Sequence, residues 1–308
     1  MWLQSRLECS GSSGALGRNR GPPARPLETP PQGCWKEDQT PEALLGVYMV
    51  QNRLRPRLRA RQTTYGLWVT LESPSITEIA VMLGLDWIVV DTEHGHLSWR
   101  EVMEHVRTVR DSETTVLVRI AEIRQDAVKR ALDVGAHGVL LPLVRNRGDL
   151  EAGMRFGRYP PAGVRGIGGE RAVQWGLGLQ EYLAQANEET MIIPLIETRD
   201  ALEDIDGILA VPGLEAIFFG PADLSASLGH LGAWEGPGVA ERILEVRDKA
   251  ARRSVASGIV GVSVQDGIGR REQGFEMIGL GSDAGMMIRS VREAQEKLGL
   301  HARPHLWF

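Results

Sequence analysis

Two acidic residues each follow an apolar run of the sequence. Glu197 directly follows the run Met191–Ile196, and Asp223 follows Ala216–Phe219 after a three-residue link. A carboxylate at the end of a buried strand is costly unless a partner binds it. The two acids lie 26 residues apart, about one strand–helix unit, so they can converge on one cation. Carboxylates without cysteine or clustered histidine partners suit Mg²⁺ or Mn²⁺ better than Zn²⁺.

Each acid also has a structural alternative. Asp223 could cap a helix that begins at Leu224, and Glu197 could pair with Arg199. Because both acids occur at the ends of successive apolar runs, we favour the metal role and predict that Glu197 and Asp223 bind one divalent cation.

A histidine follows another apolar run, Trp87–Val90, in the segment Asp91-Thr92-Glu93-His94-Gly95-His96. Imidazole titrates near neutral pH, so His94 is the natural acid–base group. Asp133 could orient His94 from the next unit, or it could be a polar residue in the last turn of a helix. We predict a catalytic pair of His94 and Asp133.

Arg119 lies near the end of the apolar run Thr115–Ile120. An arginine at the end of a buried strand requires an anionic or carbonyl partner. That partner could be an internal carboxylate, Asp91 or Glu93, or the developing oxyanion of a substrate. We predict that Arg119 is catalytic.

Glycines are concentrated in the segment Tyr159–Gly169. This segment lacks the Lys-Ser/Thr ending of a phosphate-binding loop, so we do not expect nucleotide binding. It fits a mobile cover in which the backbone at Gly168 and Gly169 approaches a small ligand. Arg165 could bind a substrate carboxylate or fix the loop.

A second backbone site is expected at the start of the helix that carries Asp223. The N–H groups of Ala222 and Asp223 would form a cradle for a substrate carboxylate.

Short apolar runs alternate with amphipathic segments from Tyr65 onward. The eight runs predict strands at Tyr65–Leu71, Trp87–Val90, Thr115–Ile120, Gly138–Leu141, Met191–Ile196, Ala216–Phe219, Ala256–Gly261 and Met277–Leu280. The segments between them predict helices at Ser75–Leu83, Trp99–Arg110, Arg124–Val134, Gly148–Phe156 and Val239–Arg252, with a further helix at Asn52–Arg61 and a final one at Ser290–Leu298. Near-continuous apolar strands alternating with helices indicate a parallel sheet covered on its outer face. Eight such units favour an α/β fold of the (β/α)8 TIM-barrel type, and no Gly-x-Gly-x-x-Gly follows the first strand.

The composition is that of an ordinary soluble globular protein, with 43% hydrophobic and 24% charged residues among 308. A net charge of −5 gives no reason to expect nucleic-acid or membrane binding, and no apolar stretch approaches a membrane span. Both cysteines, Cys9 and Cys34, precede residue 40, which excludes a thiolate nucleophile in the barrel.

Residues 1–48 are expected to be a disordered or non-native extension, followed by a single domain at 49–308. The first 40 residues are rich in Gly, Pro, Ser and Arg without apolar periodicity. A transit peptide and a translation start near Met49 are the alternatives. No apolar core of a signal peptide is present, so we expect a cytoplasmic protein. The apolar C-terminal pair Trp307-Phe308 predicts a homo-oligomer.

Four motifs, in order, resemble the HpcH/HpaI aldolase family. They are Asp91-Thr92-Glu93-His94-Gly95, Tyr159–Gly166, Ile196-Glu197-Thr198-Arg199 and Gly220-Pro221-Ala222-Asp223-Leu224-Ser225. The resemblance extends from about Thr64 to Leu298. It implies a class II pyruvate aldolase on a TIM barrel of the phosphoenolpyruvate/pyruvate type, active in aromatic or sugar acid catabolism. It also implies a hexamer, or trimer of dimers, in which the last helix packs on a neighbouring subunit.

The resemblance further implies roles for individual residues. Glu197 and Asp223 would hold Mg²⁺ or Mn²⁺, with Co²⁺ a further candidate, and the metal would chelate the carboxylate and keto oxygens of pyruvate. Arg119 would hydrogen-bond the keto oxygen as it becomes an enolate. His94, supported by Asp133, would move the proton with help from a metal-bound water. Some members of the family place a glutamine where this chain has Leu195, which removes one supporting polar contact. His96 is a further variation, in the region that would receive the aldehyde part of the substrate.

The expected reaction is reversible cleavage of a 4-hydroxy-2-oxo acid to pyruvate and an aldehyde. Its partners are therefore a 2-oxo acid, pyruvate or oxaloacetate, and an aldehyde. No lysine stands at a strand end for a Schiff base, which disfavours the class I route. The alternatives are an oxaloacetate decarboxylase or a macrophomate-synthase-like enzyme, a lyase acting on CoA esters, and a catalytically inactive metabolite-binding protein.

Overall fold

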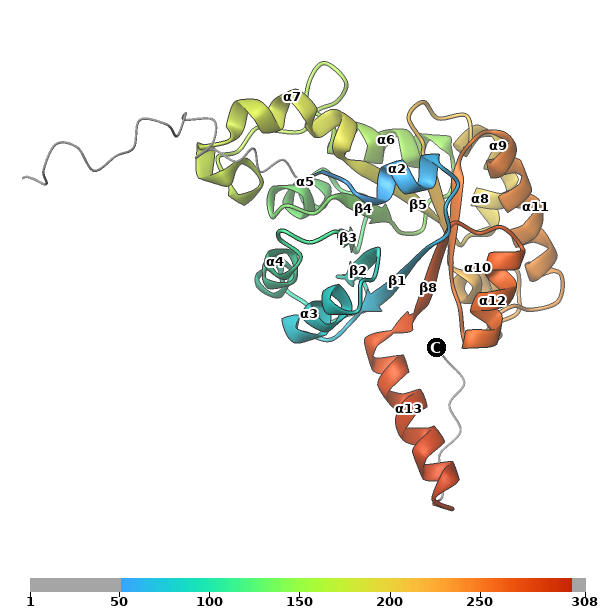
Figure 1. The fold of residues 1–308 in the computed structure, drawn as a ribbon. Helices are drawn as coiled ribbons and strands as arrows, with labels where there is room; N and C mark the ends of the chain where they lie inside the picture. The colour runs from blue at the N-terminus through green and yellow to red at the C-terminus, as the bar shows by residue number, and fades with distance from the viewer. Residues whose placement is uncertain (1–50, 301–308) are drawn as a thin grey trace, which may run out of the picture. The chain divides into compact units, whose positions relative to one another are not determined.

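The computed structural model describes residues 51–300, which form a closed barrel of eight parallel strands surrounded by helices (Figure 1). The strands neighbour one another in sequence order, and β8 closes the barrel against β1. Their bounds are β1 Thr64–Val69, β2 Trp87–Asp91, β3 Thr115–Arg119, β4 Gly138–Leu141, β5 Met191–Ile196, β6 Ala216–Phe219, β7 Ala256–Val260 and β8 Met277–Ser282. The predicted TIM barrel is confirmed.

Helices connect the strands and lie outside them (Figure 1). Their bounds are α2 Leu54–Arg59, α3 Pro74–Met82, α4 Trp99–Thr108, α5 Gln125–Asp133, α6 Arg147–Gly157, the 3-10 helix η1 Arg171–Gly176, α7 Leu179–Glu189, α8 Arg199–Glu203, α9 Ile205–Ile208, α10 Pro221–Ser227, α11 Val239–Arg252, α12 Val264–Glu272 and α13 Asp283–Lys297. Helix α13 projects away from the barrel in Figure 1, and it exposes Met287 and Val291.

The apolar core has two layers, because successive side chains of a strand point to opposite faces. One layer lies between the strands and the helices, and the other fills the barrel interior. Trp87 and Phe218 meet edge to face in the interior with 6.0 Å between ring centroids. Two glycines make room for these rings. A Cβ at Gly66 would come within 2.1 Å of Trp87, and one at Gly258 within 2.3 Å of Phe218.

The predicted bounds of β4, β5, β6 and α11 agree with the structure, and the other predicted strand ends differ by one or two residues. The final helix begins at Asp283, earlier than predicted, because the Ser282 side chain accepts a hydrogen bond from the N–H of Gly285 and caps it. Helix α12 was not predicted. Gly267 and Gly269 lower its helical propensity, and Ser263 caps it.

Several predictions concern residues outside the described range. These are the extension at 1–48 with Cys9 and Cys34, the start near Met49, and the C-terminal pair Trp307-Phe308. Within residues 51–300, no helix is both long and apolar enough to cross a bilayer.

Candidate active site

The carboxyl ends of the strands surround a cavity of about 410 Å³. Five of the predicted site residues line this cavity: His94, Arg119, Glu197, Ala222 and Asp223. They follow or end β2, β3, β5 and β6, and the carboxyl end of such a barrel is where active sites form. The fold therefore brings together residues that span 130 positions of the sequence.

Glu197 is buried at the floor of the site, with only 2% of its surface exposed. Its Oε1 accepts a hydrogen bond of 2.7 Å from the backbone N–H of Leu143, a residue with the left-handed φ of 49°. A Cβ at Gly220 would come within 2.4 Å of the Glu197 Oε2, so the glycine leaves the space that this carboxylate occupies.

The Glu197 carboxyl has a pKa raised to about 7. Burial is the main cause, and the negative charges of Asp223 and Glu93 add to it, although the Leu143 N–H and Arg119 oppose it. A bound cation would strongly stabilise the ionised form of a carboxylate in this environment.

Asp223 is exposed and lies in the first turn of α10, for which Gly220 is the N-cap residue. Its carboxylate therefore does not occupy the capping position that was the alternative for it. Arg199 donates hydrogen bonds to the carbonyl oxygen of Ser227, not to Glu197. Neither structural alternative for the two acids is found.

Arg119 is buried and forms an ion pair with the fully buried carboxylate of Asp91. Its Nε donates to Asp91 Oδ1 at 2.9 Å, and its Nη2 donates to Oδ2. The Trp68 indole N–H donates to the same carboxylate at 3.2 Å. Burial raises the pKa of Asp91, but the hydrogen bonds and charge of Arg119 outweigh it, so that the pKa is lowered. The internal ion pair anticipated as an alternative for Arg119 is thus present.

A second carboxylate, Glu93, lies beside the same guanidinium, with 2.9 Å between Glu93 Oε2 and Arg119 Nη1. Burial raises the pKa of Glu93, against the lowering effect of the positive charges of Arg119 and His94. Asp91, Glu93 and Trp68 were not predicted as site residues. The first two belong to the motif that contains His94, and their positions at a strand end were the signal that could have identified them.

His94 lies at the exposed side of the cavity. Its backbone N–H donates to Asp91 Oδ1 at 3.3 Å, and so does the N–H of Glu93 at 3.0 Å. The Asp91 carboxylate therefore orders both the arginine and the turn that carries the histidine.

The structure does not bring Asp133, Gly168 or Gly169 to this cavity. Asp133 ends α5, which returns to the amino end of β4, so it lies at the opposite end of the barrel. Gly168 and Gly169 belong to the α6–β5 connection at that same end. The roles predicted for these residues therefore require a site other than the cavity of their own chain.

Arg165 joins this remote segment to α5. It is 1% exposed, donates to Asp133 Oδ1 at 2.9 Å and to the Tyr182 hydroxyl at 3.1 Å, and lies over the Tyr159 ring. Of the two roles considered for Arg165, these contacts favour fixing the loop.

The remaining walls of the cavity are apolar. They include Trp68, Leu195, Phe218, Leu231, Trp234 and Val260. The Leu195 side chain has no hydrogen-bonding group, and it packs in the barrel interior with Ile193.

The residues present fit a divalent cation held by few protein ligands. Among residues 51–300 no group of three or more His, Cys, Asp or Glu side chains is arranged to hold a metal. Glu197 and Asp223 nevertheless line one cavity, and the negative charge of Asp223 raises the pKa of Glu197. Two carboxylates leave coordination positions for water and substrate oxygens, which suits Mg²⁺ or Mn²⁺.

The chain is similar to known proteins over most of its length. The chain is 34% identical to the hydroxypyruvate/pyruvate aldolase of Pseudomonas aeruginosa over 247 residues, covering 79% of this chain and 91% of that protein. It is 32% identical to the 5-keto-4-deoxy-D-glucarate aldolase of Escherichia coli, covering 80% and 95%. A crystal structure of an HpcH/HpaI aldolase/citrate lyase family protein from Burkholderia cenocepacia superposes with a TM-score of 0.77 at 32% identity, covering 81% and 100%.

The family profile described as HpcH/HpaI aldolase/citrate lyase matches residues 64–290, which includes every strand and the whole cavity at the carboxyl end. The chain belongs to the HpcH/HpaI aldolase/citrate lyase family.

Proposed function

We propose that this protein is a divalent-metal-dependent aldolase that reversibly cleaves a 4-hydroxy-2-oxo acid to pyruvate and an aldehyde. The observation that carries the proposal is the buried Glu197, with its pKa raised to about 7, in the cavity that Asp223 and Arg119 also line. The two relatives from Pseudomonas aeruginosa and Escherichia coli are named as aldolases, which supports this class of reaction.

In this proposal Glu197 and Asp223 hold Mg²⁺, Mn²⁺ or Co²⁺. The metal supplies a Lewis acid that polarises the 2-oxo acid group of the substrate. The N–H groups of Ala222 and Asp223, in the first turn of α10, lack intrahelical acceptors and are available to the substrate carboxylate.

Arg119 and His94 divide the remaining work. Breaking the bond between carbons 3 and 4 sends an electron pair toward the keto oxygen, and a guanidinium held by Asp91 is a preorganised donor for that charge. His94 accepts the proton of the 4-hydroxyl group as the aldehyde forms. Carbon 3 then takes up a proton to give the methyl group of pyruvate.

Asp133, Gly168 and Gly169 take part in this reaction only if they come from a neighbouring copy of the chain. Their position at the amino end of the barrel rules out contact with His94 of their own chain, whereas a second copy packed on the mouth of the cavity could supply them. This arrangement agrees with the proposed homo-oligomer, in which the exposed apolar residues of α13 pack on a neighbour.

The decisive experiment measures pyruvate release from a panel of 4-hydroxy-2-oxo acids. The purified protein is stripped with EDTA and then supplied with Mg²⁺, Mn²⁺ or Co²⁺. We expect no release without metal and restored release with it. Release that persists after complete metal removal contradicts the proposal. The same assay with oxaloacetate distinguishes the decarboxylase, because that enzyme releases CO₂ and no aldehyde.

A further inference from the structure

The segment of residues 228–238 joins α10 to α11 and forms part of the wall of the active-site cavity. We call it the mouth segment. Leu231, Gly232 and Trp234 of this segment line the cavity. Leu231 is also 90% exposed, so it marks the opening of the cavity to solvent, whereas Trp234 packs against the apolar layer of the barrel interior. Neither side chain takes part in the bond cleavage described above.

Hydrogen bonds hold the mouth segment in one conformation. The N–H of Gly236 donates to the buried hydroxyl oxygen of Ser225 at 2.7 Å, and the N–H of His230 donates to the Ser225 carbonyl oxygen at 2.9 Å. Gly229 and Gly232 have left-handed φ values of 97° and 86°, which glycine adopts without strain. The segment is therefore folded back onto α10, beside the cavity.

An ion pair fixes the residue next to Trp234. The Glu235 carboxylate accepts a hydrogen bond of 2.8 Å from Nη2 of Arg270, a residue of α12 that is 5% exposed. Nε of the same arginine donates to Asp266 at 3.0 Å. Moving Glu235 away would leave a buried guanidinium without one of its partners, which is costly. The ion pair thus positions the backbone that carries the Trp234 ring.

The charges around the cavity disfavour a second anionic group on the substrate. Glu197 and Asp223 line the cavity, and Glu93 lies beside the arginine. Among the described residues, Arg119 is the only arginine or lysine in the cavity wall, and it is paired with Asp91. In the proposed reaction Arg119 and the metal act on the 2-oxo acid group. A carboxylate at the other end of the substrate would lose hydration without gaining a cationic partner from these walls.

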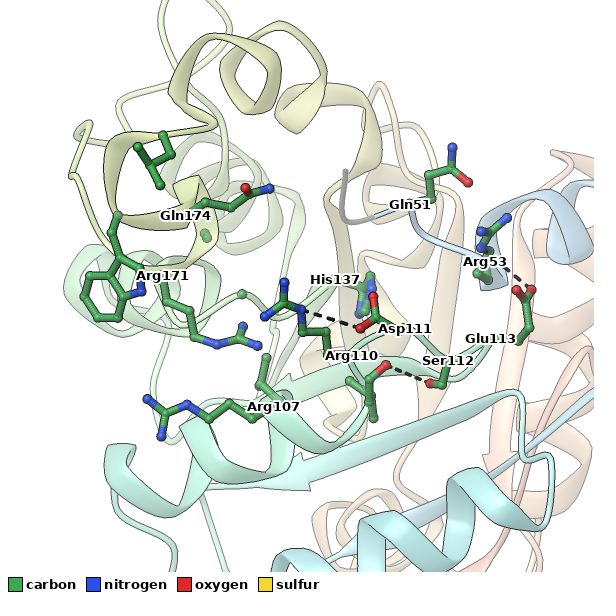
Figure 2. Close-up of a pocket in the computed structure, with 16 residues that line it drawn as sticks. Gln51, Arg53, Arg107, Arg110, Asp111, Ser112, Glu113, His137, Arg171 and Gln174 are labelled. Carbon is green, nitrogen blue, oxygen red and sulfur yellow. Dashed lines mark hydrogen bonds and ion pairs between the residues drawn. The ribbon is translucent and has the colours of Figure 1, made fainter. Parts of the chain in front are cut away.

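The amino end of the barrel has a different character. Figure 2 shows the cavity at that end, of about 960 Å³, which four arginines line: Arg53, Arg107, Arg110 and Arg171. The cavity at the carboxyl end has one arginine and mostly apolar walls. Within one chain, therefore, the cationic cavity and the catalytic cavity lie at opposite ends of the barrel.

We propose that the mouth segment selects aldehydes whose substituent is uncharged and apolar. This inference rests on the proposed aldolase function and concerns the part of the substrate beyond carbon 4. With the 2-oxo acid group held at Glu197 and Asp223, that part extends along the wall toward the opening, where Leu231 and Trp234 offer apolar surface. Covering apolar surface is favourable roughly in proportion to its area, and the cavity of about 410 Å³ has room for more than pyruvate.

Two aldehydes of matched length test this selectivity. 4-Methylpentanal has an isopropyl group where succinic semialdehyde has a carboxylate. The full chain is supplied with Mn²⁺ and pyruvate, and formation of each 4-hydroxy-2-oxo acid is measured. We expect kcat/KM to be about tenfold or more higher for 4-methylpentanal, because small apolar groups in a fitting pocket discriminate by at least this factor. Equal values overturn the inference. So does a preference for succinic semialdehyde, which would mean that a cation from a neighbouring copy reaches the cavity.

Leu231→Arg places a cation at the opening of the cavity. It should raise kcat/KM for succinic semialdehyde and lower it for 4-methylpentanal, so that their ratio changes by about tenfold or more. Because Leu231 is 90% exposed, the substitution leaves the core intact. Met82→Arg is the matched control, since Met82 is 81% exposed in α3 and does not line the cavity. An unchanged ratio in Leu231→Arg, or an equal change in Met82→Arg, contradicts the role of the mouth segment.

Glu235→Gln tests the ion pair that positions this segment. It should raise KM for 4-methylpentanal by about fivefold or more, as expected for loss of a charged hydrogen bond. Exchange of the methyl hydrogens of pyruvate with deuterium oxide should stay unchanged, because that exchange requires no aldehyde. Equal impairment of both measurements would show general disruption and contradict the positioning role of Glu235.

The exchange measurement on the wild type also separates this inference from the proposed function. Absence of metal-dependent exchange overturns the aldolase function, and the inference with it. Exchange that is present without a preference for 4-methylpentanal overturns the inference alone.

Discussion

Arg119 binds the Asp91 carboxylate through both Nε and Nη2, and its Nη1 lies 2.9 Å from Glu93. Two N–H groups of the guanidinium donate to Asp91, whereas Nη1 makes no hydrogen bond to Glu93 Oε2, so the other N–H groups remain for the cavity. The internal ion pair and the catalytic role are therefore compatible. The ion pair fixes the orientation of the Arg119 side chain, and this orientation sets the direction of its remaining N–H groups.

This relationship predicts that Asp91→Asn lowers kcat/KM by about a hundredfold, because a misaligned donor loses much of its effect on the transition state. The substitution should also change the pH profile, since the same carboxylate holds the turn that carries His94. Steady-state kinetics across pH checks this. The matched control is Asp126→Asn, which alters an exposed pair with Arg124. If Asp91→Asn keeps wild-type kcat/KM, Asp91 does not position Arg119.

Glu197→Gln should abolish metal-dependent activity and stabilise the metal-free protein above pH 7. Burial raises the pKa of Glu197 from 4.5 to about 7, so ionising it in the folded state costs up to about 3 kcal/mol. The stability of the metal-free wild type therefore rises as pH falls from 7 toward 4.5, as far as this group is concerned. Urea unfolding of both proteins at pH 8 measures the difference, with the exposed Glu151→Gln as control. Equal stability of the two proteins would show that ionisation of Glu197 does not lower the free energy of unfolding.

Gly220→Ala should weaken Mn²⁺ binding and activity while leaving the barrel folded. The added Cβ would lie 2.4 Å from Glu197 Oε2, so the carboxylate must move away from its position beside Asp223. Electron paramagnetic resonance of bound Mn²⁺ and pyruvate release measure the two effects. Gly269→Ala is the control, because a Cβ at Gly269 meets nothing within 4 Å. Unchanged Mn²⁺ affinity in Gly220→Ala would contradict the metal assignment.

His137 should reduce stability at acid pH. Burial lowers its pKa from 6.5 to about 4, so the unfolded chain binds a proton in this window that the folded chain does not. The contribution of His137 to the free energy of unfolding is largest above pH 6.5. It falls by up to about 3 kcal/mol as the pH drops toward 4. Glu197 acts in the opposite direction, so the comparison must be between wild type and His137→Asn, which keeps an acceptor for the Val116 N–H.

We expect His137→Asn to lose less stability than the wild type between pH 7 and pH 5. Urea unfolding at both pH values provides the measurement. Identical losses in the two proteins would show that His137 is not the group responsible.

Much of the fold could be predicted because its pattern is local. A strand buried on both faces is a short run of apolar residues, and the runs at Met191–Ile196 and Ala216–Phe219 match β5 and β6. Once the sheet is known to be parallel, residues at the ends of such runs share one end of the barrel, which is why Glu197, Asp223, Arg119 and His94 were found together. Helix α12 was missed because its glycines weaken the helical pattern. Its start is stabilised by the side chain of Ser263, which caps it.

Contacts between distant residues were decided only by the tertiary structure. The Leu143 N–H that binds Glu197, the use of Asp91 as the partner of Arg119, and the remote position of Asp133 depend on how the chain closes on itself. Sequence alone determined the barrel and the acids at its strand ends, because hydrophobic burial repeats along the chain. Electrostatic and hydrogen-bond partners that are far apart in the sequence follow no such repeat. Only the three-dimensional structure therefore shows which residues pair.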